Sequence, residues 1–321
     1  MSRPGRSEIR WAVVILAAFV GLALLPLIVR REDVLNFFVV FLLSVTLAQS
    51  WNLIAGYAGQ VNLGHAAFFG LGALLTRTLW IQGTPILLAM GAGAMVAMAF
   101  GLLVGVPAFR LRGAYFAIGT LALAEILRIS VGNSLPEIST LPAATIAGYS
   151  LSRRFYLMLA LAAVSVGAVT WTAASRVGLG MRAIREDEGA AEASGVGALS
   201  HKLLALTLST GLAGLAGGAF AYYHISYYPQ HPFSPQWTFD ALLITFIGGV
   251  GTLHGPVLGA AFYVFLKEYL AIRWVELHLL IFGALFVAIV LLLPGGLVEV
   301  FGRARRLFLT ARGRYTVAST S

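Results

Sequence analysis

The sequence contains no cysteine and little charge: only 11% of its 321 residues are Asp, Glu, Lys or Arg. Without cysteine, the chain has no disulfide framework, no thiolate nucleophile and no cysteine-ligated metal site. Soluble domains carry roughly 25% charged residues. Because hydrophobic residues make up 59% of this chain, a water-soluble globule is excluded, and we expect most of the chain to lie in a lipid bilayer.

Lysine is scarce: Lys202 and Lys267 are the only two, and neither follows a glycine. A Walker A phosphate loop requires a Gly-Lys pair, so the sequence has no such ATP-binding motif. The six histidines lack the His-Glu-x-x-His spacing of a zinc site, and no Gly-x-Ser-x-Gly nucleophile elbow occurs. We therefore expect neither an enzyme nor a bound metal or cofactor.

Basic residues outnumber acidic ones by 22 to 13, which gives a formal net charge of +9. In a soluble protein this excess would indicate nucleic acid, but here the charges lie mainly between apolar runs, where they set membrane orientation. We expect no nucleic-acid partner. Fourteen of the 22 basic residues fall on one side of the expected membrane, which predicts that both termini are cytoplasmic.

Ten apolar runs approach the length of about 20 residues that a transmembrane helix requires. They lie near 11–29, 34–54, 62–80, 85–107, 113–131, 154–174, 202–225, 237–253, 256–270 and 274–294. We therefore expect an all-α, polytopic membrane protein with about ten transmembrane helices. The number becomes eight or nine if the glycine-rich stretch at 248–259 makes a broken or re-entrant element.

These runs and charges divide the chain into three parts. We expect a cytoplasmic tail at 1–10 and a transmembrane domain at 11–294, which includes a cytoplasmic loop at 176–202. A basic cytoplasmic tail follows at 295–321.

Two glycine-rich segments interrupt the apolar runs. Unwound backbone at membrane depth is tolerated only where protein or a water-filled cavity satisfies its polar groups, as in the paths of many transporters. We therefore predict that both segments line a translocation path or gate. The alternatives are a polar loop at the interface and close helix packing through small residues. The candidates are Gly56, Gly59, Gln60, Asn62, Gly64, His65, Gly248, Gly249, Gly251 and Gly255.

A third segment carries an acid into an apolar run. Glu125 and Arg128 are spaced i, i+3, so they can pair on one helix face and reduce the cost of charge in the membrane. An acid inside a membrane is a functional candidate, and we assign Glu125 and Tyr115 of the same segment to the path. The alternative is an interfacial anchor.

The least membrane-like internal stretch is 176–202, on the expected cytoplasmic side. Arg182 to Ser194 is typical of a short amphipathic helix, and Gly195 is typical of its end. A charged helix held between two spans would suit a soluble partner. Taken alone, the stretch is more typical of a solvated loop.

At these segments the chain resembles the permease subunit of branched-chain amino acid ABC importers, the high-affinity leucine, isoleucine and valine uptake family. The resemblance covers roughly 45–295. It rests on five motifs in order: Gly56-Tyr-Ala-Gly-Gln-Val-Asn-Leu-Gly-His, Arg112-Gly-Ala-Tyr-Phe-Ala-Ile-Gly-Thr-Leu, Ala183-Ile-Arg-Glu-Asp-Glu-Gly-Ala-Ala-Glu, Ala213-Gly-Leu-Ala-Gly and Gly248-Gly-Val-Gly-Thr-Leu-His-Gly-Pro-Val-Leu-Gly.

The resemblance implies an assembly in a bacterial inner membrane. Its other members are a second, related permease, two cytoplasmic ATPases that use ATP and Mg, and an extracytoplasmic solute-binding protein. Relatives carry leucine, isoleucine and valine, other amino acids, urea, short amides or aromatic acids. The rival hypothesis is an ion-coupled secondary transporter, in which Glu125 and Asp240 carry protons or sodium.

The resemblance also assigns the loop at 176–202. Glu188-Gly-Ala-Ala followed by Gly195 resembles the coupling element by which ABC permeases dock on their ATPases, with Gly189 as a departure from the usual pattern. The residues that it implies for coupling are Arg185, Glu186, Asp187, Glu188, Ala190, Ala191 and Gly195.

Overall fold

The computed structural model describes residues 17–29, 31–135 and 141–273, together with scattered residues of 280–299. These residues form helices and no strand, so the predicted all-α class is confirmed for them. The predicted tail at 1–10 lies outside the described residues. So do most of the predicted run at 274–294 and most of the predicted tail at 295–321.

Five helices are long and apolar enough to cross a membrane. They are α3 (Glu32–Asn52, continued by the π-helix η1, Leu53–Tyr57), α5 (Ile86–Ala108), α6 (Ala114–Ser134), α8 (Leu151–Ala174) and α11 (Ala198–Tyr223). Each matches a predicted run to within a few residues. The expected total of about ten is not confirmed, because the remaining described helices are shorter or less apolar.

The other described elements connect or flank these five helices. They are α2 (Leu25–Ile28), α4 (His65–Ile81), α7 (Ala143–Ala147), α9 (Arg176–Glu186), α10 (Glu188–Ala193), η2 (His231–Phe233), α12 (Pro235–Gly248) and α13 (Gly255–Arg273). Helix α4, with 17 residues, is nearly as long as a span.

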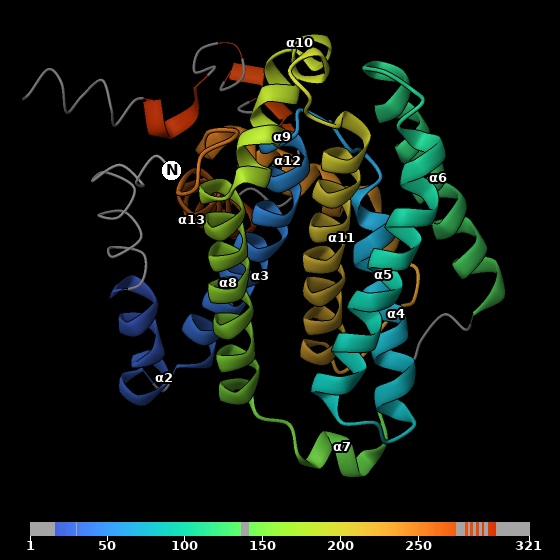
Figure 1. Ribbon diagram of the computed structural model, residues 1–321. Coiled ribbons are helices and arrows are strands. Elements are labelled where there is room, and N and C mark those ends of the chain that lie inside the picture. The colour runs from blue at the N-terminus through green and yellow to red at the C-terminus, as the bar shows by residue number, and fades with distance from the viewer. Residues whose placement is uncertain are drawn as a thin grey trace, which may run out of the picture.

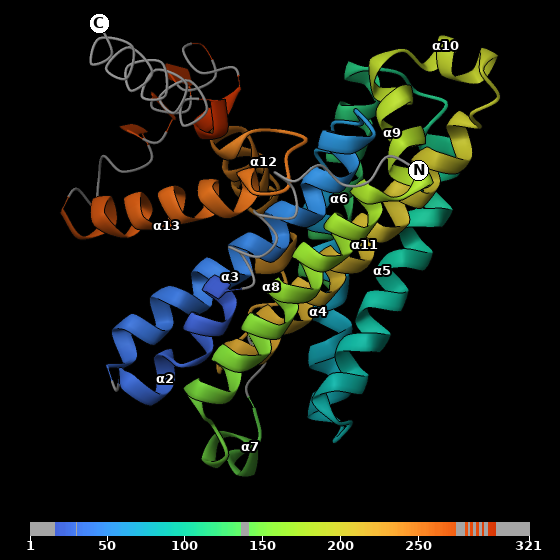
Figure 2. The ribbon, with the colours of Figure 1, turned by 60° about the vertical axis from the view of Figure 1, so that its left-hand side comes forward.

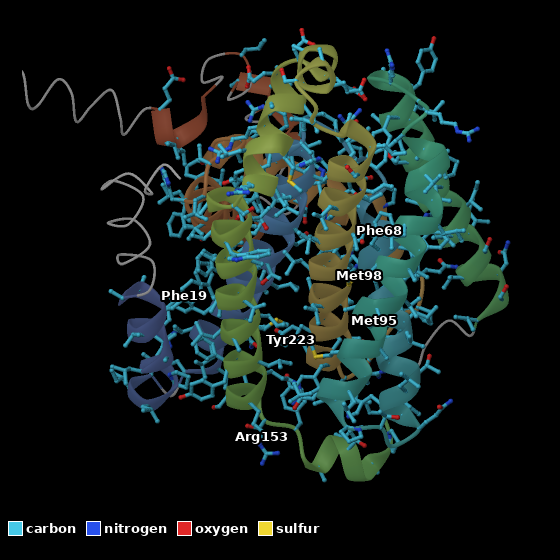
Figure 3. All side chains as sticks on the ribbon, viewed as in Figure 1. Phe19, Phe68, Met95, Met98, Arg153 and Tyr223 are labelled. Carbon is cyan, nitrogen blue, oxygen red and sulfur yellow. The ribbon has the colours of Figure 1, made fainter. Side chains whose placement is uncertain are left out.

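Helix α11 lies at the centre of the bundle and packs against α3, α4 and α5, while α8 packs against α3 (Figure 1). Glycines let the backbones approach closely. A Cβ added at Gly72 of α4 would lie 2.2 Å from the carbonyl oxygen of Gly214 in α11. On the α5 side, Met98 lies against Gly211 of α11 (Figure 3). Small residues at helix contacts are typical of membrane bundles, where lipid supplies no hydrophobic driving force between helices.

Helix α6 stands apart from this centre (Figure 1). It buries only the stripe Phe116, Thr120 and Ala124 and leaves its other apolar side chains exposed or half-buried. The stripe spacing of four residues gives one helix face, so α6 is attached to the bundle along a single line.

The predicted break after the run at 237–253 is present. Helix α12 ends at Gly248 and α13 begins at Gly255. With 14 residues, α12 is about 21 Å long, less than the roughly 30 Å thickness of a hydrocarbon core. Figure 2 shows α13 projecting from the side of the bundle. The two helices cross with backbones in contact, since a Cβ at Gly259 would lie 2.0 Å from the Ile244 oxygen.

The carboxyl end of α11 is held by two buried arginines. Arg77 of α4 donates to the main-chain oxygens of His224 (3.0 Å) and Ile225 (2.7 Å). Arg154 of α8 donates from Nε to the Tyr222 oxygen at 2.9 Å. A cation at a helix carboxyl end is favoured by the free carbonyls and the helix dipole. These arginines therefore fix the end of the central helix that lies opposite α10.

Candidate functional site

The end of α3 and the loop between α12 and α13 are joined by side-chain amides. Asn52 Oδ1 accepts a hydrogen bond from the Gly251 amide at 2.8 Å, and Asn52 Nδ2 donates to the Thr252 oxygen at 3.0 Å. One helical turn earlier, Gln49 Nε2 donates to the Leu253 oxygen at 2.8 Å. The two predicted glycine segments, about 200 residues apart in the chain, therefore meet at one place.

Arg185 of α9 reaches the same place. Its guanidinium Nη1 donates to the main-chain oxygen of Gly56, in the π-helix that follows α3. π-Helical turns are rare and are frequent at functional sites. We call the contact of Arg185 with Gly56, Gly59 and Gly251 the glycine joint.

The joint admits the arginine because its glycines have no side chains. A Cβ at Gly251 would lie 2.3 Å from Arg185 Nη1, and a Cβ at Gly59 would lie 3.1 Å from Arg185 Cγ. Both glycines also have positive φ, +70° at Gly59 and +76° at Gly251, which other residues rarely adopt. A larger residue at Gly251 would displace the guanidinium.

Arg185 supplies the positive charge at this joint. Partial burial lowers the pKa of His254, in the loop between α12 and α13, below its usual range, so this imidazole is neutral at pH 7. Thr252 orders the same loop, because its hydroxyl donates to the Gly249 oxygen at 2.8 Å and accepts from the Gly255 amide at 3.1 Å.

Asn62 and His65 lie fully buried between α3 and α4. The Asn62 oxygens accept from Gly64 N (side chain, 2.8 Å) and Trp51 Nε1 (main chain, 2.8 Å), while His65 Nε2 lies 2.7 Å from Ser50 Oγ. Asn62 Nδ2 and His65 Nδ1 have no hydrogen-bond partner among the described residues. Such atoms are costly to bury, so this region holds unused hydrogen-bonding capacity.

The other candidates of the glycine segments are placed as follows. Gln60 is half-buried, and its Nε2 donates to the Ala58 oxygen at 3.2 Å. A Cβ at Gly64 would lie 2.1 Å from the Thr120 oxygen of α6. Gly248, Gly249 and Gly255 form the tight connection between α12 and α13.

The predicted amphipathic helix from Arg182 to Ser194 is wrong in one respect. The structure has two helices there, because α9 ends at Glu186 and α10 begins at Glu188. Asp187 between them has an extended backbone, and its Oδ1 accepts from the Ala190 amide at 2.9 Å as the N-cap of α10. Gly189 lies inside α10 without interrupting it, and Gly195 (φ +84°) follows its end, as predicted.

The coupling candidates face two ways. Glu188 faces inward, where its carboxylate lies 2.6 Å from Lys202 Nζ of α11; the Lys202 side chain is 6% exposed. Ala191 is also buried, in a small core with Ile184. Five candidates, Arg185, Glu186, Asp187, Ala190 and Gly195, are exposed, and of these Glu186, Asp187 and Ala190 lie next to one another at the start of α10, where they can contact another protein.

Tyr115 and Glu125 lie on α6, away from the glycine joint. Tyr115 is 75% exposed. Glu125 pairs with Arg128, as its spacing predicts. A comparable pair links α12 and α13, where Asp240 Oδ2 lies 3.1 Å from Lys267 Nζ and Tyr263 Oη donates to Asp240 Oδ1 at 2.6 Å. The structure thus brings together the glycine segments and Arg185, whereas α6 meets the first glycine segment at Thr120 and not through Tyr115 or Glu125.

Sequence reasoning missed Asn52 and Gln49, which hold the joint together. The available signal was that both are polar residues near the end of an apolar run. They lie about one and two helical turns before Gly56, the start of the first glycine motif. Among the described residues, no group of three or more His, Asp or Glu side chains is arranged to hold a metal ion.

Comparison with known proteins gives consistent similarities. Residues 34–290 match the family described as branched-chain amino acid transport system, permease component. The high-affinity branched-chain amino acid transport system permease proteins LivM of Salmonella typhimurium and Escherichia coli are each 26% identical over 327 residues, which cover 92% of this chain and 76% of each relative.

A more distant similarity is to a probable branched-chain amino acid transport permease protein LivM of Methanocaldococcus jannaschii. It is 24% identical over 307 residues, which cover 78% of this chain and 88% of the relative. No solved structure matches the chain.

Proposed function

The chain belongs to the branched-chain amino acid transport permease family, and from this premise we propose that it is the permease subunit of an ABC importer. In this proposal it moves branched-chain or related amino acids across a bacterial inner membrane by alternating access. The observation that carries the proposal is the α9–α10 element, two short helices between the spans α8 and α11 with an exposed outer face.

Separate ATPase subunits supply the energy in this proposal. The chain has no Gly-Lys pair and hence no Walker A loop, so ATP and Mg belong to the partner ATPases. Their docking surface is the exposed face at Glu186, Asp187 and Ala190. The remaining partners are a second permease and an extracytoplasmic solute-binding protein.

The end of the bundle that carries α10 is the cytoplasmic end in this proposal. Arg176, Arg182 and Arg185 lie there on α9, and basic residues are retained on the cytoplasmic side of membrane proteins. Both termini, the tail at 1–10 and the tail at 295–321, are assigned to the same side.

The translocation path is proposed to pass the glycine segments. The unpartnered atoms Asn62 Nδ2 and His65 Nδ1 support this proposal, because an amino acid or water in an opened path would give them hydrogen-bond partners. Gln60 of the same segment is half-buried.

The ion-coupled alternative depends on Glu125 and Asp240 as carriers of protons or sodium. Both carboxylates already pair with a basic side chain, Arg128 and Lys267 respectively. An ion pair stabilises the charged carboxylate, which opposes proton uptake. This observation favours the ABC importer. Within it, urea, short amides and aromatic acids remain the alternative substrates.

Docking is tested by placing a bulky charge on the exposed face of α10. We expect Ala190→Arg to abolish co-purification of the ATPase subunits and ATP-driven uptake while the chain still inserts into the membrane. Ala174→Arg, at an exposed alanine at the end of α8, is the matched control and should retain both. Normal co-purification with Ala190→Arg would refute the docking role.

A further inference from the structure

Arg185 differs from the other coupling candidates in the direction of its contact. It belongs to the last turn of α9, yet its guanidinium binds the Gly56 carbonyl, 129 residues away, at the end of α3. Arg182 of the same helix binds only nearby main-chain oxygens, those of Gly178 and Ala173. Of these two arginines, Arg185 is thus the one whose hydrogen bond reaches a distant segment of the chain.

The contact joins three segments of the chain at once, α9, the end of α3 and the loop between α12 and α13. Gly56 belongs to the π-helical end of α3, and Gly251 belongs to the loop between α12 and α13. Asn52 ties this loop to α3 through two hydrogen bonds. A displacement of α9 is therefore applied to α3 and to the α12–α13 loop together.

The contact between Arg185 and the glycines is close, so a displacement of α9 would not be absorbed by free space between them. A Cβ at Gly56 would lie 2.6 Å from the Gly251 amide nitrogen, and one at Gly251 would lie 2.3 Å from Arg185 Nη1. Packed contacts of this kind switch between discrete arrangements and do not deform continuously. The planar guanidinium also keeps several donors in a fixed geometry, which a lysine ammonium does not.

We propose that Arg185 is the positioning residue that transmits movement of the α9–α10 element to the two glycine segments. It couples ATPase closure to the opening of the path, and it does not itself bind the ATPases. The Glu188–Lys202 pair has the separate task of holding α10 to α11. This inference rests on the proposed function.

The test uses the complete complex in proteoliposomes, with its ATPases, partner permease and binding protein, and L-leucine as the probe. The readout is the ratio of ATP hydrolysed to leucine accumulated. We expect Arg185→Ala and Arg185→Lys to raise this ratio by about tenfold, the size of a modest coupling free energy between two sites. The ATPases should co-purify in the wild-type amount, because docking does not use Arg185.

Matched variants separate transmission from general damage. Arg182→Ala removes a neighbouring arginine of α9 and should keep the wild-type ratio. Gly251→Ala leaves Arg185 in the chain but fills its place, so it should raise the ratio. Gly113→Ala also places an alanine at a positive φ, +57°, with no atom within 4 Å of the new Cβ, and should not raise the ratio.

Three results would overturn the inference. A wild-type ratio in Arg185→Lys and Gly251→Ala would show that the contact transmits nothing, even if Arg185→Ala fails to fold. Loss of the ATPases from Arg185→Lys would show a docking residue. A raised ratio in Arg182→Ala would show a general effect of α9. Failure of the proposed function is distinct, because the wild-type complex itself would then accumulate no leucine with ATP.

Discussion

The side-chain oxygen of Asn52 accepts a 2.8 Å hydrogen bond from the amide of Gly251, 199 residues further along the chain. The same side chain donates to Thr252 at 3.0 Å. A single buried asparagine thus satisfies two main-chain groups of a glycine-rich loop and fixes that loop to the end of a transmembrane helix.

Asn52→Ala is expected to destabilise the protein by about 1–3 kcal/mol, because it leaves the Gly251 amide without its partner. The measurement is the apparent melting temperature of the purified protein in detergent. Asn133→Ala is the control, since Asn133 is exposed near the end of α6. Equal melting temperatures for the two variants would show that the hydrogen bonds of Asn52 to the loop do not stabilise the protein.

Glu188→Gln is expected to destabilise the protein by about 1–3 kcal/mol, because it leaves the charge of Lys202 buried without a counter-ion; the partial exposure of Glu188 limits the effect. Lys202→Met combined with Glu188→Gln should recover most of the loss. A double-mutant cycle of detergent melting temperatures measures this coupling. Additive effects would refute the internal role of Glu188.

Arg153 and Arg154 are adjacent but differ in environment. Arg154 is 1% exposed and its guanidinium lies 3.6 Å from the ring centre of Tyr149, whereas Arg153 points away from the bundle (Figure 3). We expect Arg154→Gln to cost roughly 2–4 kcal/mol through lost charged hydrogen bonds and cation–π contact. Arg153→Gln should leave the melting temperature unchanged. A similar loss of stability in both variants would contradict the stabilising role of Arg154.

The absence of cysteine makes orientation directly measurable. Ser194 is exposed at the end of α10, and Arg153 is exposed in the first turn of α8, at the opposite end of the bundle (Figure 3), so the two test positions are Ser194→Cys and Arg153→Cys. In intact cells whose outer membrane is permeabilised, a membrane-impermeant maleimide should label Cys at 153 and not at 194. Inside-out vesicles should give the reverse. Labelling of the cysteine at 194 from the outside would contradict the proposed topology.

The sequence was sufficient for the five membrane-length helices because their apolar runs are bounded by charge or glycine. The run at 202–225 became α11 at Ala198–Tyr223, and the glycines at 248–255 ended one helix and preceded the next. The pairing of Glu125 with Arg128 also followed from spacing alone. Local information determines such features.

Contacts between distant segments could not be predicted in the same way. In the sequence, Arg77 and Arg154 are only charged residues near the ends of apolar runs. Their hydrogen bonds to the carboxyl end of α11 are visible only in the structure. The motif predicts a coupling role for Arg185, but it contains no signal for the hydrogen bond that Arg185 makes with Gly56, 129 residues away. The break at Asp187 was missed because a capping side chain competes with a continuous amphipathic pattern.

The energy source tests the account most directly. Proteoliposomes would carry either this chain alone or the complete complex, and accumulation of radiolabelled leucine would be measured with ATP or with a proton or sodium gradient. We predict accumulation only in the complete complex with ATP, and none in the chain alone with either gradient. Gradient-driven accumulation by the chain alone, without ATP, would contradict the proposal that it is a permease subunit energised by separate ATPases.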